Sequence, residues 1–247
     1  MNHLNDAVAI VTGASSGIGA ATARRRAAGG ARVVLAARDA DELATHAEEI
    51  REAGGQAAGK VTDVTNAEDL TALVAFAEET FGPVDILVNN AGLMLFSYWK
   101  EVKLADWDKM IDVNLRGYLH AIAAVLPGMI ARGAGRILNM SSVAGHHVGE
   151  AAGVYGATKF FIRGITESLR QELGTAHGIQ VGMVSPGVID TGWSDKLPDG
   201  PAKDAAQSLN AVAIPPEAVA EAVAFALNQP PGVAINEVIV APTKQPW

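Results

Sequence analysis

The stretch that decides the fold is residues 7–19, AVAIVTGASSGIG, in which an apolar run ends in a turn with three glycines. The apolar run has the length and composition of a strand buried on both faces, and a helical pattern begins at residue 17. Glycines in such a turn let the backbone approach a pyrophosphate closely, and the free N–H groups of the following helix face its charge. The alternative is a tight strand–helix connection without a ligand. Its place in the chain favours nucleotide binding.

The same alternation continues along the chain and predicts seven strands and six helices. The expected strands are residues 7–12, 32–37, 56–62, 84–88, 135–140, 179–184 and 235–240, and the expected helices are 17–29, 39–53, 66–81, 104–131, 153–176 and 215–228. Strands that alternate with helices form parallel sheets covered on both faces. We therefore expect an α/β fold: a single-domain Rossmann fold with a doubly wound, seven-stranded parallel sheet.

No linker or shift in composition divides residues 1–247, so we expect one nucleotide-binding domain. Residues 190–213 lack clear periodicity and are rich in Asp, Gly, Pro and Ser. A segment of that length without regular structure is often functional. We expect it to form a substrate-binding loop.

The composition excludes several classes of function. With 19 basic and 27 acidic residues the net charge is −8, which disfavours non-specific electrostatic binding to nucleic acid or to an anionic membrane. The absence of cysteine excludes disulfide scaffolds and thiolate zinc sites, and we expect no metal site. The N-terminus lacks a signal-peptide pattern, and no apolar run is long enough to cross a membrane. We expect a soluble, cytoplasmic protein.

The end of the second strand predicts which dinucleotide is bound. The residue there meets the adenosine ribose, and an acidic residue favours a free 2′-hydroxyl. Ala37 occupies this place and Arg38 follows, so a guanidinium is offered to a 2′-phosphate. The pair favours NADP(H), with NAD(H) as the other possibility because Asp39 comes next. In the alternative reading, Arg38 is a solvated loop charge.

At this point the sequence resembles the short-chain dehydrogenase/reductase family, in its compact form of about 250 residues, over nearly the whole chain. The matching motifs, in order, are Thr12-Gly-X3-Gly-X-Gly19, Asp63-Val64, Asn89-Asn90-Ala91-Gly92, Asn114, Ser141-Ser142, Tyr155-X3-Lys159 and Pro186-Gly187. The C-terminal segment EVIVAPTKQP is similar to the branch of NADP-dependent reductases that act on small hydroxy acids, ketones and related alcohols.

Tyr155 and Lys159 are the candidate proton-transfer pair. Four residues apart in a helix, they lie on one face, so their charges can couple. An ammonium close to a phenol favours the phenolate and moves the tyrosine pKa toward the working range. We therefore expect Tyr155 to exchange a proton with the carbonyl or alcohol oxygen. On an isolated helix such a pair is usually surface, but the surrounding motifs favour catalysis.

Two further residues complete the candidate catalytic set. Ser142 lies just beyond a strand end, where its hydroxyl can hydrogen-bond the substrate oxygen, and Ser141 is the alternative for this role. The resemblance implies that Asn114, expected inside the long helix 104–131, holds a water that links Lys159 to solvent. Otherwise Asn114 is an ordinary interior helix residue.

The other motifs are expected to position the cofactor. The resemblance implies that Asp63 and Val64 contact the adenine, that Asn90, Ala91 and Gly92 border the ribose, and that Lys159 bonds the nicotinamide ribose. The expected cofactor-binding residues are Gly13, Ser15, Ser16, Gly17, Ile18, Gly19, Arg38, Asp63, Val64, Asn90, Ala91, Gly92, Tyr155, Lys159, Pro186, Gly187, Ile189 and Thr191.

For a few side chains the sequence allows more than one role. His146 and His147 could line the pocket or lie solvated in a loop. The aromatic residues near 94–99 and Trp193 could form an apolar substrate wall, although such clusters more often pack a core. Arg26 lies on a helix stripe that faces the sheet, so its guanidinium must reach solvent or a carboxylate.

These observations favour an NADP(H)-dependent oxidoreductase that interconverts a ketone and a secondary alcohol by hydride transfer. A reductase of carrier-bound β-ketoacyl groups would share the catalytic residues, and a nucleotide-binding regulatory protein without catalysis is the third possibility. The apolar surplus on helices 104–131 and 153–176 indicates a subunit interface, and the resemblance implies a homotetramer.

Overall fold

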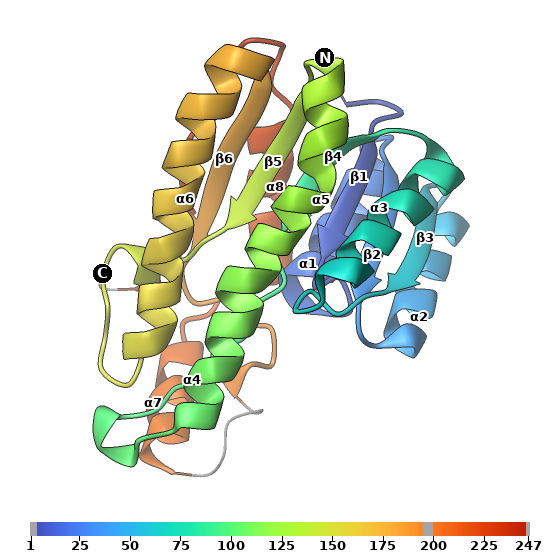
Figure 1. Cartoon of the computed structure of the whole chain (residues 1–247). Helices are drawn as coiled ribbons and strands as arrows, with labels where there is room; N and C mark the ends of the chain where they lie inside the picture. The colour runs from blue at the N-terminus through green and yellow to red at the C-terminus, as the bar shows by residue number, and fades with distance from the viewer. Residues whose placement is uncertain (1–3, 195–199, 246–247) are drawn as a thin grey trace.

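The computed structural model of the chain describes residues 4–194 and 200–245 and is built around one parallel sheet (Figure 1). The strands are β1 (Val8–Thr12), β2 (Arg32–Ala37), β3 (Gln56–Val61), β4 (Val84–Asn89), β5 (Gly135–Met140), β6 (Ile179–Pro186) and β7 (Glu237–Val240). All seven are parallel and lie in the order β3-β2-β1-β4-β5-β6-β7. The seven predicted strands and the α/β class are confirmed.

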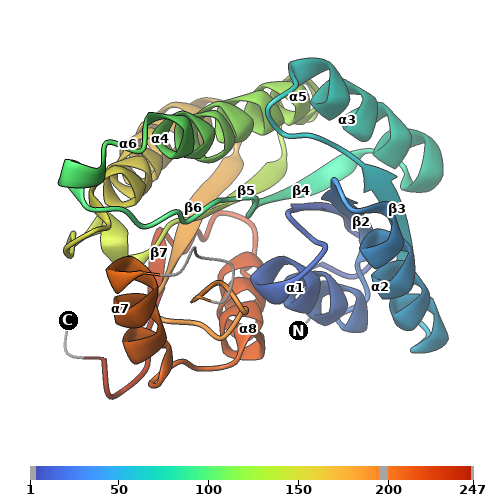
Figure 2. The same cartoon turned by 90° about the horizontal axis from the view of Figure 1, so that it is seen from below.

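The helices pack in two layers. They are α1 (Gly17–Ala28), α2 (Ala40–Glu52), α3 (Ala67–Phe81), α4 (Leu104–Ile111), α5 (Gly117–Arg132), α6 (Gly153–His177), α7 (Pro201–Asn210) and α8 (Pro216–Leu227), with short 3₁₀ turns at Trp99–Glu101 and Val143–Gly145. Helices α1, α2 and α8 cover one face of the sheet, and α3, α5 and α6 cover the other (Figure 2). Because both faces are covered, the central strands are apolar throughout rather than alternating.

The strand order reverses between β1 and β4, and this reversal opens a crevice at the carboxyl ends of these strands. The register places Thr12 beside Ala36 and Asn89 beside Asn139, so the polar residues that follow these strands gather at one edge. Helices α4 and α7 lie beyond the same edge (Figure 1).

Two predicted segments differ from the structure. The helix expected over 104–131 is divided into α4 and α5 by a π turn, Asp112–Arg116, which holds Asn114. The segment 190–213 contains α7 in its second half, so the prediction of an irregular loop is wrong there. Three alanines and Leu209 recur there at helical spacing and Gly200-Pro201 is an ordinary helix start, so the sequence carried a signal for this helix. Residues 195–199 lie outside the described residues.

The Arg26 side chain also differs from its prediction, which was that the guanidinium reaches solvent or a carboxylate. Its side chain does neither: the residue is 2% exposed and belongs to none of the ion pairs among the described residues. Its position on the helix directs it toward the sheet, as predicted, but the packing of α8 against α1 closes the path to solvent.

Among the described residues, no helix combines the length and apolar character that crossing a bilayer requires.

Candidate active site

A cavity of about 640 Å³ lies along the carboxyl ends of the strands, from the glycine-rich turn to Tyr155. Of the predicted catalytic and cofactor-binding residues, all but Asn114 line it. They come from the ends of β1, β2, β4, β5 and β6, from the turn after β3 and from α6. Parallel strands bring their carboxyl ends to one edge, which is why residues so far apart in sequence meet here.

The glycine-rich turn is closely packed and lines the cavity. Gly13 has φ +66°, and a Cβ on Gly19 would come within 2.1 Å of the Gly13 carbonyl oxygen, so both positions require glycine. No side chain caps α1 at Ser16, whereas Asp39 and Asn66 cap α2 and α3 through the amides of residues 42 and 68. The first amides of α1 are therefore left for an anionic group.

Thr12 and Asn90 hold the turn in position. The Thr12 hydroxyl accepts hydrogen bonds from the amides of Asn90 (3.0 Å) and Ala91 (3.1 Å). The Asn90 side-chain amide donates to the carbonyl oxygens of Thr12 (2.9 Å) and Gly13 (3.2 Å). The Asn90 side chain thus braces the junction of β1 and β4, and its contribution to a ribose would come through the surrounding backbone.

Charged side chains line the end of the cavity that lies beside β2. Ala37 ends β2 and is buried, while Arg38 is exposed and makes no hydrogen bond or ion pair with the described residues. The Asp39 carboxylate accepts a hydrogen bond from the Glu42 amide (3.1 Å) at the start of α2. Asp63 accepts bonds from the Thr65 amide and hydroxyl, which, with the Arg38 charge, lower the pKa of its carboxyl.

Tyr155 and Lys159 lie side by side at the other end. The Lys159 Nζ is 5.7 Å from the centroid of the Tyr155 ring and the same distance from that of Tyr118. It donates a hydrogen bond to the Met140 carbonyl (2.9 Å), which also accepts one from the Tyr118 hydroxyl (2.9 Å). This carbonyl at the end of β5 sets the position of the Lys159 amine. The role of Tyr118 was not predicted, because its position in a helical pattern does not show that it shares the Met140 carbonyl with Lys159.

The electrostatics of this pair differ from the prediction. Burial raises the pKa of Tyr155, opposed by a hydrogen bond with Ser142, and burial lowers the pKa of Lys159 to about 7. The expectation that Lys159 lowers the Tyr155 pKa is therefore wrong for the protein alone. Desolvation disfavours the charged form of both groups, and a half-protonated amine offers little charge to offset it.

The two serines have different partners. The Ser142 hydroxyl lies against the Tyr155 phenol, accepts a hydrogen bond from the Ala144 amide (3.1 Å) and is 3.4 Å from the Pro186 carbonyl. The Ser141 hydroxyl donates to the backbone carbonyl of Lys159 (3.3 Å). Both serines line the cavity, but of the two only Ser142 forms a hydrogen bond with the Tyr155 phenol.

Asn114 lies buried behind the cavity in the π turn. Its Oδ1 accepts from the Leu93 amide (2.7 Å), and its Nδ2 donates to the Leu93 carbonyl (2.8 Å) and the Thr158 hydroxyl (3.1 Å). Thr158 in turn donates to the Tyr155 carbonyl (2.7 Å). The side chain thus ties the segment after β4 to α6, and the expected role of Asn114 in holding a water stays a prediction.

The chain was compared with known proteins with this geometry in view. A profile described as short chain dehydrogenase matches residues 7–202. An uncharacterized oxidoreductase of Staphylococcus saprophyticus is 41% identical over 99% of both chains. The chain belongs to the short-chain dehydrogenase family. The predicted family is confirmed.

Solved structures agree with this short-chain dehydrogenase along nearly its whole length. The closed form of a serine dehydrogenase complexed with NADP⁺ is 33% identical, covers 97% of this chain with 96% of its own and has a TM-score of 0.89. A short-chain dehydrogenase/reductase from Burkholderia phymatum in complex with NAD is 28% identical, with coverage of 97% and 90% and a TM-score of 0.87. The Rossmann fold predicted from the sequence is thereby confirmed.

The cavity of this short-chain dehydrogenase ends in an apolar wall beside Tyr155. The Phe96 ring lies 6.3 Å from that of Tyr155 and packs edge-on against Trp193 at 5.4 Å, measured between centroids. Leu209 of α7 completes the wall, together with Leu93, Met94, Leu95, Val143 and Val188. Leu209 was not predicted because residues 190–213 were expected to form a loop without regular structure.

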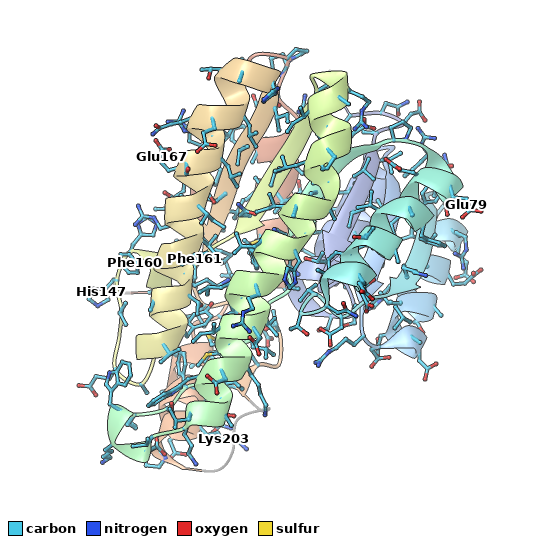
Figure 3. The ribbon with its side chains drawn as sticks, viewed as in Figure 1. Glu79, His147, Phe160, Phe161, Glu167 and Lys203 are labelled. Carbon is cyan, nitrogen blue, oxygen red and sulfur yellow. The ribbon has the colours of Figure 1, made fainter. Side chains whose placement is uncertain are left out.

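His146 and His147, which could have lined the pocket, lie outside the cavity. His146 is exposed and hydrogen-bonds Glu237 of β7 through Nε2 (2.6 Å). His147 is also exposed and lies at the outer edge beside α6 (Figure 3). Within residues 4–194 and 200–245, no group of three or more His, Asp or Glu side chains is placed to hold a metal ion.

Proposed function

We propose that this short-chain dehydrogenase interconverts a ketone and a secondary alcohol with NADP(H), using Tyr155 as the proton donor and acceptor. The observation that carries the proposal is that Tyr155, Ser142 and Lys159 line the same cavity as the uncapped start of α1. A proton-transfer group and a pyrophosphate-binding turn in one cavity is the arrangement that hydride transfer requires.

The bound nicotinamide supplies the hydride in reduction, and it accepts the hydride in alcohol oxidation. In reduction the carbonyl carbon gains the hydride and its oxygen takes the proton of the Tyr155 phenol. Ser142, which contacts that phenol, donates a hydrogen bond to the same oxygen and orients it. Because burial raises the pKa of Tyr155, the phenol is protonated at neutral pH and ready to act as the acid.

Lys159 serves the phenolate that proton donation leaves behind. Its pKa of about 7 lets the amine be protonated near neutral pH, when a negative charge forms on the neighbouring ring. Asn114 acts as a positioning residue, since its bonds to Leu93 and Thr158 fix the wall opposite Tyr155 and the helix that carries it.

Arg38 supports the preference for NADP(H). Its guanidinium is exposed at the end of the cavity and lacks a carboxylate partner among the described residues, so it is available to a 2′-phosphate. The Asp39 carboxylate accepts the capping bond from Glu42 instead of standing at the end of β2. Neighbouring structures hold NADP⁺ or NAD, so cofactor selectivity must be measured on this protein.

The wall beside Tyr155 supports an uncharged, apolar carbonyl substrate. Among the described lining residues, Arg38, Asp39 and Asp63 lie at the adenosine end, and Lys159 is the one charged side chain at the other. The Lys159 amine is already bonded to the Met140 carbonyl and lies beside the Tyr155 ring, so a carboxylate substrate would find no second cation there, whereas an aromatic ring can pack on Phe96 and Trp193. We therefore place aryl and alkyl ketones ahead of hydroxy acids and carrier-bound β-ketoacyl groups, with Thr191, Trp193 and Leu209 of the expected segment 190–213 contributing to the substrate end.

A substrate panel tests this proposal directly. NADPH consumption would be followed with aryl ketones, keto acids and acyl thioesters, for the wild type and for Tyr155→Phe. The proposal expects the highest kcat/KM with aryl ketones and loss of turnover in the variant. Equal turnover by Tyr155→Phe would refute the mechanism, while a preference for acyl thioesters would favour the carrier-bound substrate.

We further propose a homotetramer. The exposed large apolar residues of helices α4, α5 and α6 are Leu104, Ile111, Leu119, Ile130 and Phe160, and Figure 3 shows Phe160 and Phe161 on α6. A surface of this kind favours association through these helices. Light scattering after gel filtration measures the mass, and a monomer would contradict the proposal.

A further inference from the structure

Arg26 is a buried cation with unused hydrogen-bond donors. It lies near the end of α1, is 2% exposed, and neither Nε nor Nη2 has a hydrogen-bond partner among the described residues. Buried guanidinium groups are normally paired because the charge and each unsatisfied N–H are costly to remove from water. Nothing in the proposed catalytic cycle uses this residue.

Arg26 borders a second cavity, of about 360 Å³, between the ends of α1 and α8. Figure 2 shows these two helices side by side. Arg25, Glu221, Phe225 and Gln229 also line the cavity. Because the helices run opposite to the strands, it lies at the amino ends of the sheet, away from the cavity that holds Tyr155.

The charges around this cavity are unbalanced. Arg25 donates to Glu221 (2.6 Å), which is the one ion pair on the cavity wall among the described residues. Arg136 lies nearby and donates to the backbone carbonyls of Leu227 and Gln229. Burial, followed by repulsion from Arg25 and Arg136, lowers the pKa of Arg26 to about 10, so it remains charged at neutral pH. Two cations, Arg25 and Arg26, line the cavity with a single carboxylate, Glu221, and the Arg136 charge adds to theirs, in a protein whose net charge is −8.

We propose that this cavity is a binding site for a small oxyanion, a phosphate or carboxylate group held by Arg26 with Arg25. A guanidinium presents paired N–H groups that match the two oxygens of such a group, and the unused donors of Arg26 are of this kind. The exposed ring of Phe225 at the rim gives room for an organic portion of the ligand.

Thermal unfolding in inorganic phosphate tests the proposal. The measurement uses the Arg38→Ala background, which removes the contribution of the 2′-phosphate position, with sodium chloride at equal ionic strength as the reference. Phosphate binding at the first amides of α1 is common to all the variants and cancels when their shifts are compared. The unfolding midpoint is expected to rise by about 3–5 °C at a tenfold excess over Kd. Malonate in a parallel titration distinguishes a carboxylate preference from a phosphate preference.

Arg26→Leu should lower this shift to the part that the start of α1 contributes, because it removes the Arg26 donors while keeping an apolar side chain. Arg51→Leu, which removes a surface arginine paired with Glu48 in its own helix, should retain it. No shift in the parent protein with either anion, or an unchanged shift in Arg26→Leu, would overturn the proposal.

A second variant guards against misfolding of Arg26→Leu. Phe225 is 58% exposed, so Phe225→Glu should fold, and it places a carboxylate at the rim that competes with the anion. The phosphate shift should fall in Phe225→Glu and persist in the neutral Phe225→Gln. Equal shifts in these two variants would count against the site.

Discussion

The amine of Lys159 lies 5.7 Å from the centre of the Tyr155 ring and is hydrogen-bonded to the Met140 carbonyl. The end of β5 thus holds the buried Lys159 amine beside the half-buried Tyr155 ring. Burial raises the pKa of the phenol and lowers that of the amine, so at neutral pH both groups tend toward their neutral forms. The pair is consequently suited to pass a proton, not to store a charge.

Tyr155→Phe should reduce kcat for ketone reduction by about 10²–10⁴-fold, because the substrate oxygen loses its proton donor. The ring and its contact with Phe96 remain, so NADPH affinity and the unfolding midpoint should change little. Stopped-flow absorbance and fluorescence titration provide the two measurements. A variant that binds NADPH normally and still turns over at the parent rate would remove Tyr155 from the mechanism.

Ser142→Ala should lower kcat by about 10²-fold or more, since the hydroxyl that orients the substrate oxygen is lost. Ser141→Ala is the matched control, because the Ser141 hydroxyl bonds the Lys159 backbone and not the phenol. Steady-state rates of both variants decide between the two serines. The reverse order of effects would assign the role to Ser141.

Lys159 should make the stability of the cofactor-free protein depend on pH. Its pKa falls from 10.5 to about 7 on folding, so between these values the unfolded chain binds more protons. The free energy of unfolding should therefore rise with pH from 7 to 9, by at most about 1.4 kcal/mol per unit from this group. Lys159→Met should flatten that rise in urea titrations at each pH. An equal slope in both proteins would contradict the buried, neutralised amine.

Arg38→Ala should lower the ratio of kcat/KM for NADPH to that for NADH by about tenfold or more, because a charge-assisted bond to the 2′-phosphate is lost. Its exposed position keeps the effect local to the adenosine end. Arg51→Leu serves as a charge-matched control on the neighbouring helix. An unchanged ratio would show that selectivity resides elsewhere.

Much of the fold follows from local patterns. The turn after β1 and the apolar runs predicted the seven strands, because parallel strands buried on both faces leave continuous apolar segments. The π turn was not predicted, since a single inserted residue leaves the helical period nearly intact. Helix α7 was not predicted although its alanines and Leu209 recur at helical spacing, because the surrounding Asp, Gly, Pro and Ser residues favoured a loop. The electrostatics of Tyr155 were mispredicted because desolvation depends on packing that spacing does not reveal.

The sequence by itself determined the order of strands and helices, the glycine-rich turn and the identity of the residues at the strand ends, since these depend on local periodicity and backbone sterics. Only the tertiary structure decided that Lys159 shares the Met140 carbonyl with Tyr118, that Asn114 braces Leu93 and Thr158, and that Arg26 is closed in by α8. These relationships join segments far apart in the chain, and burial and charge at each of them depend on every neighbour that packs around it.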